Sequence, residues 1–421
     1  MTLIHHRRSR TRAVAVPLLA TALAGVALAG CGGSDGAGGG KGSVTMWTYP
    51  VIFDEAKNEA YWDGMVEKFE KQNKDISVKV ETYPWADRDT ALGTAIASGK
   101  GPDVVYLVPD QLPKYAPNIV PAGDYMPADA KSDYTDFALE SVTVGDDVLG
   151  TPILTSANPL ICDKRVFEAV GEDSYPETWD DLKALGPKMK DEGYYALSYT
   201  GDTAQTLNMT FYPLLWQAGG EVFAEDGESV AFDDPAGVEA LTYLTEFVEE
   251  GWTPKDLVTT TPNLEQTPVA KGKVACTWTN VATDVEPFWG RENIVVQPPL
   301  TGEESAGYGT VGALSMLKGA DTEAAGKWIN FVAQPENAAD LEKGAGYFPA
   351  RTSADDLYPD DQLQQAVAAT LPSMNAGPLE EKAREVMGVL APELQAALLG
   401  KKSPEDALKA AAEAADAQIA R

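Results

Sequence analysis

The chain has 421 residues, 44% of them hydrophobic, and its 64 acidic residues outnumber 33 basic ones for a formal net charge of −31. A chain this acidic repels phosphate backbones and anionic lipid headgroups, which argues against a nucleic acid partner. Its two histidines, His5 and His6, fall within an apparent leader, so the exported chain lacks the Ser-His-Asp triad, the HExxH zinc site and every other histidine site. We expect no metal and no cofactor.

Residues 1–30 have the features of a secretory leader. Four arginines precede an apolar run from Ala13 to Ala29, which Pro17 interrupts and which is too short to span a membrane comfortably. The run ends in Leu-Ala-Gly-Cys, which resembles the lipobox of bacterial lipoproteins, where the leader is cut before an acylated cysteine. We therefore predict lipidation at Cys31 and a flexible Gly/Ser tether over residues 31–43. An ordinary cleaved leader with an incidental cysteine is the alternative.

Strand and helix patterns alternate at the start of the exported chain. A strand is predicted at VTMW, then a helix over EAYWDGMVEKFEKQN with Met65 and Phe69 on its apolar face, then a strand at ISVKVET. RDTALGTAIASGKG predicts a second helix that ends in glycine, and PDVVYLV predicts a buried parallel strand. This order predicts an α/β fold, and the length of the chain predicts two lobes.

A segment rich in proline and small residues then changes the pattern. GTPILTSANPLICDKRVF is typical of an extended strand that crosses between lobes and runs into a helix. Further on, FDDPAGVEALTYLTEFVEEG predicts a helix capped by Asp234, with Pro235 in its first turn. A strand at GKVACTW, a helix over ADTEAAGKWINFVAQP and a C-terminal helix opening at Ser403 complete the expected elements.

Cys162 and Cys276 are the two cysteines beyond Cys31. Outside the cytoplasm a remaining pair can form a disulfide. Each also lies in an apolar, strand-like run, where a free thiol packs well as a small hydrophobe. Both readings stay open from the sequence, although a disulfide is slightly favoured.

Two features of the sequence could indicate an enzyme: a glycine-rich motif and the many carboxylates. GYGTVG, from Gly307 to Gly312, matches the dinucleotide pattern GxGxxG, but it follows a polar turn and leads into a strand, which is the reverse of the required context. Two carboxylates at a set separation suffice for glycoside hydrolysis, but no spacing among the acids singles out a pair. A secreted carboxylate-dependent glycan hydrolase or lyase remains an alternative function.

Aromatic residues recur at the ends of the predicted strands. The chain has nine tryptophans and sixteen tyrosines. Those near strand ends are Trp47, Tyr49, Tyr83, Trp85, Trp216, Trp278 and Tyr347. Open α/β sheets bind ligands beyond their strand ends, and a flat ring suits the C–H face of a sugar. As a group, these residues favour a carbohydrate ligand.

The order of segments resembles the extracellular solute-binding proteins of ABC importers, in the branch that includes maltose-binding protein. The segments that carry the resemblance are VTMW to FEKQN, ASGKGPDVVYL, TPILTSANPLICDKRVFEAVG, YPETWDDL, YPLLWQAGGEVF, FDDPAGVEALTYLTEFVEEG, GKVACTW, ALSMLKGADTEAAGKWINFVAQPENA, GYFPARTS and SPEDAL. They span nearly the whole exported chain. Each is loose alone, but their order and spacing together are specific.

The resemblance implies two α/β lobes joined by crossing hinge strands, with a ligand cleft between them. Residues 44–153 and 308–350 would form the first lobe, and residues 154–307 and 351–421 the second. The ligand touches both lobes only when they close, so its binding shifts the population toward closure. The implied protein is a monomeric, non-enzymatic receptor, anchored outside the cell, that delivers its solute to ABC permease subunits.

The resemblance also implies ligand-binding positions. Carried onto this sequence, they are Tyr49, Asp54, Trp85, Asp110, Gln111, Thr155, Ser156, Asn208, Trp278, Asn280, Tyr308 and Tyr347. The chain departs from the maltose branch at Leu107, at Thr279–Ala282 and near Glu380, where that branch has tryptophan rings. A sugar or oligosaccharide other than maltodextrin, or another polyol-like solute, therefore fits better. A receptor for a non-sugar solute is a further alternative.

Overall fold

The computed structural model describes residues 42–52, 54–354 and 356–420. The predicted leader, Cys31 and tether residues 31–41 lie outside the described residues. Strand β1 starts at Gly42, two residues before the predicted strand, because Gly42 donates its N–H to the carbonyl of Asp75 and pairs with Ile76. The last two residues of the predicted tether therefore belong to a sheet.

Six strands form the first of two main sheets, in the order β2-β1-β3-β13-β4 with β7 beside β13. They are β1 (Gly42–Thr48), β2 (Ile76–Thr82), β3 (Val104–Leu107), β4 (Ile119–Val120), β7 (Thr151–Thr155) and β13 (Val311–Leu317). β1 runs parallel to β2 and β3, which confirms the predicted β-α-β opening. β13 is antiparallel to β3, β4 and β7, so a segment distant in sequence closes this sheet.

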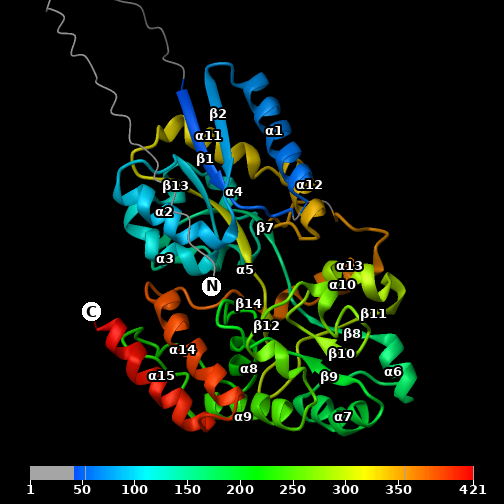
Figure 1. The fold of residues 1–421 in the computed structure, drawn as a ribbon. Helices are drawn as coiled ribbons and strands as arrows, with labels where there is room; N and C mark the ends of the chain where they lie inside the picture. The colour runs from blue at the N-terminus through cyan, green and yellow to red at the C-terminus, as the bar shows by residue number, and fades with distance from the viewer. Residues whose placement is uncertain (1–41, 53, 355, 421) are drawn as a thin grey trace, which may run out of the picture. The chain divides into compact units, whose positions relative to one another are not determined.

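Helices cover both faces of this sheet, and together they make the first lobe (Figure 1). They are α1 (Glu55–Gln72), α2 (Arg88–Ala97), α3 (Leu112–Tyr115), α4 (Ala128–Lys131), α5 (Asp136–Glu140), α11 (Thr322–Val332) and α12 (Pro335–Ala345). On one face, Phe69 of α1 packs edge-on against Trp328 of α11 with ring centroids 5.2 Å apart. Leu92 of α2 belongs to the cluster on the other face. A small hairpin, β5 (Thr143–Val144) and β6 (Asp147–Val148), lies in the same part of the chain.

Four strands form the second sheet, in the order β11-β8-β10-β9. They are β8 (Leu160–Asp163), β9 (Tyr195–Ser198), β10 (Val274–Thr277) and β11 (Ile294–Gln297), and a separate pair is β12 (Gly307–Tyr308) with β14 (Met374–Asn375). Side chains alternate across β8: Cys162 belongs to the core cluster on one face and Ile161 to the cluster on the other. Both faces are buried, as the apolar runs in PLICDK and GKVACTW predict.

The second sheet and its helices make the second lobe. The helices are α6 (Lys164–Val170), α7 (Trp179–Asp191), α8 (Tyr212–Gln217), α9 (Pro235–Glu249), α10 (Ala282–Trp289), α13 (Gln362–Ala368), α14 (Ala383–Leu398) and α15 (Pro404–Ile419). Asp234 caps α9 by accepting from Gly237 N at 2.9 Å, and Ser403 caps α15, as the sequence predicts. α14, which packs against α9 and α15, has no counterpart among the predicted elements.

Three segments join the lobes, and they are hydrogen-bonded to one another. Thr155 and Phe348 exchange backbone N–H to carbonyl bonds at 2.8 and 2.9 Å, and Asn158 N donates to Tyr308 O at 2.8 Å. A Cβ at Gly309 would lie 2.5 Å from the carbonyl oxygen of Ser156, so this close approach requires glycine. Since β7 runs to Thr155 within the first sheet, the predicted boundary between residues 153 and 154 falls inside a strand.

The two cysteines left open by the sequence form a disulfide. Cys162 of β8 and Cys276 of β10 face each other directly in antiparallel register, with their Cα atoms 4.1 Å apart. Both are fully buried in the core of the second lobe. The bond therefore links the two central strands of that sheet.

The described ranges contain no helix that is long and apolar enough to cross a membrane. In the same ranges, no group of three histidine, cysteine or carboxylate side chains is placed to hold a metal ion.

Candidate ligand-binding site

A cavity of about 290 Å³ is lined by residues of both lobes and of the segments that join them. The first lobe contributes Trp85, Arg88 and Asp110, and the second lobe contributes Met209, Asp284 and Arg384. Five of the twelve predicted ligand positions line it, namely Trp85, Asp110, Ser156, Tyr308 and Tyr347. These five come from five separate stretches of the sequence, which the fold brings to one place.

Trp85 forms the aromatic wall on the first-lobe side. It lies in a short 3-10 helix, η1 (Trp85–Asp87), just beyond β2, and its indole N–H donates to the carbonyl of Pro50 at 3.1 Å. The ring of Tyr49 stacks against it, with centroids 4.9 Å apart and planes inclined by 29°. Tyr49 is 1% exposed and does not line the cavity, so it supports the tryptophan from behind.

Charged groups surround Asp110, which lies in the 3-10 helix η2 (Pro109–Gln111) after β3. Arg384 donates to Asp110 Oδ1 at 3.0 Å, and Asn208 donates to Oδ2 at 3.4 Å. Burial and the neighbouring Arg384 charge lower the pKa of Arg88, although carboxylates nearby oppose this shift. Both guanidinium groups line the cavity.

Neutral hydroxyl groups line the cavity where the chain passes between lobes. Ser156 Oγ accepts from Thr310 N at 3.2 Å. Burial is the main cause that raises the pKa of Tyr347, to about 12, and that of Tyr308 still further. Both phenols therefore keep their protons at neutral pH and can donate hydrogen bonds.

The second-lobe wall is built by loops after β9 and β10. Met209 and Thr279 lie there beside Asp284, whose carboxylate accepts from Val281 N at 3.1 Å at the start of α10. Burial raises the pKa of Asp284, and the bond from Val281 partly opposes the shift. Met209, Thr279 and Asp284 also line a second cavity of about 330 Å³, which therefore adjoins the first along this wall.

Several buried polar atoms beside the cavity have no hydrogen-bond partner among the described residues. They are Nε of Arg88, Nε of Arg384, Oδ1 of Asn208 and Oγ1 of Thr310. These atoms are enclosed by protein, so the polar groups that a ligand meets directly are lining side chains such as Ser156, Asn158 and Tyr308. With the rings of Trp85 and Tyr347 beside them, the cavity suits a molecule that has both hydroxyl-like groups and an apolar face.

Seven predicted ligand positions do not line this cavity. Asp54 is exposed and caps α1, and Trp278 is buried with its indole N–H on the carbonyl of Thr210. Gln111 and Thr155 bind protein groups, Asp89 Oδ1 and the carbonyl of Phe348. Asn280 lines the second cavity. Tyr49 and Asn208 act on lining residues from behind, as described above.

The prediction omits other lining residues, and the charged ones are Arg88, Asp284 and Arg384. Arg88 follows Trp85 by three residues, within the same turn, so its closeness to a predicted position was a usable signal. Arg384 had no such signal. It starts a helix in the last tenth of the chain, and only the fold carries it to Asp110.

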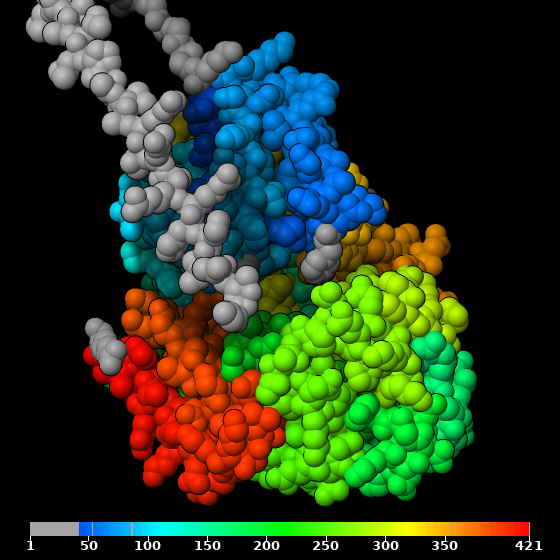
Figure 2. Space-filling model, in the orientation of Figure 1, coloured from blue at the N-terminus to red at the C-terminus, as the bar shows by residue number. Residues whose placement is uncertain are grey.

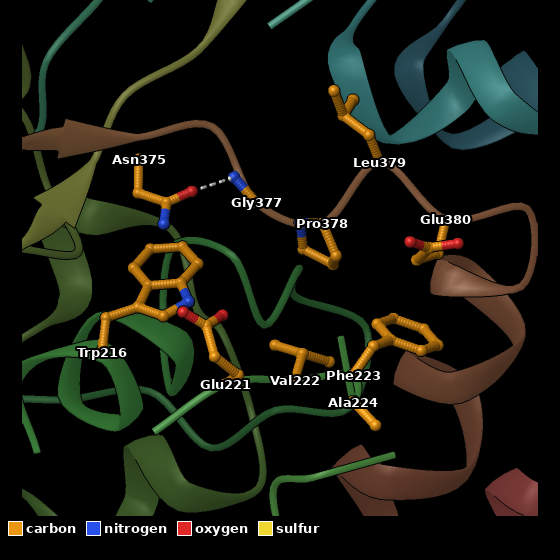
Figure 3. Close-up of a pocket in the computed structure, with 10 residues that line it drawn as sticks. All are labelled: Trp216, Glu221, Val222, Phe223, Ala224, Asn375, Gly377, Pro378, Leu379 and Glu380. Carbon is orange, nitrogen blue, oxygen red and sulfur yellow. Dashed lines mark hydrogen bonds between the residues drawn. The ribbon is translucent and has the colours of Figure 1, made fainter. Parts of the chain in front are cut away.

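A separate cavity of about 200 Å³ lies in the second lobe and is drawn in Figure 3. Trp216 and Phe223 line it together with Glu221, Asn375 and Glu380. Figure 3 shows Glu380 on the loop before α14, with Phe223 below it and Trp216 at the opposite end. Glu380, one of the positions where a tryptophan is absent, therefore faces this cavity rather than the one that Trp85 lines.

Comparisons with known proteins agree with this architecture. Residues 54–339 match the family model of the bacterial extracellular solute-binding proteins. The maltodextrin-binding protein of Bacillus subtilis is 25% identical over 374 residues, which cover 84% of each chain.

Two solved structures superpose on nearly the whole described chain. One is an ABC substrate-binding protein of Listeria monocytogenes in complex with cycloalternan, with a TM-score of 0.75, 23% identity and coverage of 90% of this chain and 99% of that one. The other is the cyclic alpha-maltosyl-1,6-maltose binding protein of Arthrobacter globiformis, with a TM-score of 0.76, 22% identity and coverage of 90% and 98%. The predicted two-lobed α/β fold is confirmed.

Proposed function

We propose, on the premise that this chain belongs to the bacterial extracellular solute-binding protein family, that it captures a carbohydrate between its lobes and delivers it to an ABC permease. The observation that carries the proposal is Trp85, stacked on Tyr49 and placed in one cavity with hydroxyl, amide and charged groups. A sugar ring has C–H faces that pack on an indole and hydroxyls that pair with such groups. This family consists of binding proteins, so the solute is carried and not converted.

Relatives support the carbohydrate class. The Bacillus subtilis relative binds maltodextrin by its name, and both superposed structures concern cyclic oligosaccharides. This chain has Leu107, fully buried in β3, where the maltose branch has a tryptophan. The cavity that Trp85 lines, of about 290 Å³, is close to the lower limit of the usual range for ligand sites. We therefore infer a small sugar or a short oligosaccharide other than maltodextrin.

The proposed mechanism is closure of the lobes about the three joining segments. We propose lobes close to the predicted bounds, with the first crossing moved to follow Thr155. The lobes share few covalent connections at this point, and a solute that contacts both walls stabilises the closed arrangement by its differential contacts. The permease would then distinguish the closed, loaded receptor from the open one.

We also propose that the mature protein is a monomer that begins at an acylated Cys31 and is held outside the cell by its lipid. A single acyl chain anchors only marginally, so more than one chain is expected on the mature protein. Mass spectrometry of the N-terminal peptide tests this proposal. Release of a Cys31→Ala variant into the medium is the expected result, and an unmodified N-terminal peptide in wild type would contradict it.

The function is tested by calorimetry of the purified chain against a panel of mono- and oligosaccharides, together with mass spectrometry of any ligand that is released on denaturation. We expect stoichiometric binding of at least one sugar, without release of reducing sugar. If no sugar in the panel binds, the carbohydrate proposal is wrong. If an amino acid or peptide binds instead, the protein is still a solute receptor but its solute is not a sugar.

A further inference from the structure

A cluster of charged groups bridges the two lobes at the cavity that Trp85 lines. Arg384, in the first turn of α14, places Nη1 3.2 Å from Asp89 Oδ2 and Nη2 3.0 Å from Asp110 Oδ1. Both acids belong to the first lobe, Asp89 in α2 and Asp110 in η2. One guanidinium from the second lobe thus pairs with two carboxylates of the first. We name Asp89, Asp110 and Arg384 the interlobe clasp.

The views of the whole molecule agree with this contact. The orange start of α14 lies next to the cyan surface of the first lobe in Figures 1 and 2. Lys114 of α3 and Glu385 of α14 approach to 3.8 Å in the same place. That second pair is more than one third exposed on both sides, so it contributes little. The contact is therefore centred on the clasp.

Buried groups of the first lobe orient Asp89 independently of Arg384. Gln111, which is fully buried, donates to Asp89 Oδ1 at 2.8 Å, and Tyr115 donates to the backbone carbonyl of Asp89 at 3.3 Å. The Asp110 side chain is 5% exposed, against 19% for Arg384 and 29% for Asp89. Ion pairs in such partly desolvated places are screened less than exposed ones. Gln111 therefore has a positioning role, although it does not line the cavity.

We propose that Arg384 is a positioning residue for solute binding, which holds the Asp110 carboxylate toward the cavity and favours the closed arrangement of the lobes. This inference rests on the proposed function. The net charge of the chain is −31, so the two acidic lobes repel each other as they approach. The clasp supplies an attractive contact between unlike charges at the point where they meet. Solute affinity should therefore depend on Arg384 through its charge.

The first test measures the Kd of the bound sugar for wild type and Arg384→Gln at 50 and 500 mM NaCl. We expect about 10-fold weaker binding for the variant at low salt and a difference of roughly threefold at high salt, because salt screens the clasp. Salt also screens the repulsion between the lobes in both proteins. The informative quantity is therefore the ratio of the variant Kd to the wild-type Kd at each salt concentration. Lys402→Gln is the matched control, because Lys402 pairs with Glu393 inside the second lobe.

Two further variants separate charge from folding. Arg384→Lys keeps the charge but lacks the planar fork that reaches two carboxylates, so it should restore affinity in part. Asp89→Asn removes the first-lobe partner of Arg384 Nη1. It should weaken sugar binding at low salt, and by less at high salt, as Arg384→Gln does. An Arg384→Gln affinity equal to that of wild type at both salt concentrations would overturn the proposal.

The second test needs no sugar and keeps failure of the clasp distinct from failure of the proposed function. Small-angle X-ray scattering of the ligand-free proteins at low salt should give a larger radius of gyration for Arg384→Gln and Asp89→Asn than for wild type and Lys402→Gln. Equal radii for all four proteins would overturn the role in closure. If no sugar binds to wild type while the radii differ as expected, the clasp stands and the proposed function falls.

Discussion

The two lobes support the cavity by different means. In the first lobe the wall at Trp85 rests on packed rings, since Tyr49 stacks against it and Tyr106 meets its edge with centroids 6.1 Å apart. In the second lobe the wall consists of loop residues such as Met209 and Thr279, and the sheet beneath is cross-linked by a disulfide. A wall of packed rings therefore faces a wall of loop residues above a cross-linked sheet. We expect the aromatic wall to be rigid, the loop wall to be adaptable, and the disulfide to stabilise the second lobe.

The largest expected effect is on the stability of the second lobe. Cys162 and Cys276 are 114 residues apart in sequence, and a bond that closes so long a loop restricts the unfolded chain. Replacing both with alanine should lower the free energy of unfolding by about 2–5 kcal/mol. Denaturant unfolding under non-reducing conditions measures this loss, and reduced wild type should behave similarly. A double variant as stable as oxidised wild type would show that the bond adds nothing to this lobe.

The second effect is a pH dependence that belongs to the first lobe. Glu342 of α12 is 3% exposed, and burial raises its pKa to about 8 from an ordinary value of 4.5. Between these two values the folded protein holds a proton that the unfolded chain has released. The free energy of unfolding must therefore fall as pH rises through this window and level off above it.

Glu342→Gln should remove roughly 3 kcal/mol of that fall between pH 5 and 8.5. Denaturant unfolding at the two pH values measures it. Glu336→Gln is the matched control, because Glu336 lies in the first turn of the same helix and is exposed. If the free energy of unfolding of Glu342→Gln varies with pH as it does in wild type, the proton that the folded protein retains is not on Glu342.

A third prediction concerns ligand affinity at the aromatic wall. Trp85→Ala removes the ring that faces the cavity and should raise the Kd of the bound sugar about 30-fold, or about 2 kcal/mol. Tyr49→Phe keeps the supporting ring and removes only its hydroxyl, so its Kd should stay within about threefold of wild type. Titration calorimetry compares the two. Equal effects of both changes would mean that the Tyr49 hydroxyl contributes as much to binding as the Trp85 ring.

The smallest expected effect is on the adaptable wall. Met209 lies on the second-lobe wall of the cavity that Trp85 lines, and it also lines the adjoining second cavity. A flexible thioether adjusts to its neighbours, so Met209→Ala should raise the Kd only about fivefold, or about 1 kcal/mol. The same calorimetric titration measures it. If Met209→Ala weakens sugar binding more than Trp85→Ala does, the loop wall and not the aromatic wall makes the larger contribution to affinity.

Local patterns in the sequence predicted most of the elements that build the lobes. The helix capped at Asp234 and the buried strand at GKVACTW are confirmed, and both patterns depend on neighbours within a few residues. The parallel β-α-β opening is also confirmed, and it pairs strands that only one helix separates in the chain. Five of twelve predicted ligand positions line the cavity that Trp85 lines, and all five lie beyond strand ends or at crossings, where an α/β fold collects side chains. Tyr49, Thr155 and Trp278 also lie at strand ends, but their side chains turn to protein partners instead.

The amino-acid sequence by itself pointed to the family, the α/β class and the aromatic character of the site. Only the tertiary structure decided that Cys162 and Cys276 are bonded and that Tyr49 stands behind Trp85. It also decided that Arg384 reaches Asp110, 274 positions earlier in the chain. The physical reason is that caps and periodic apolar faces are local, whereas the pairing of charges across lobes depends on how two separately folded cores meet.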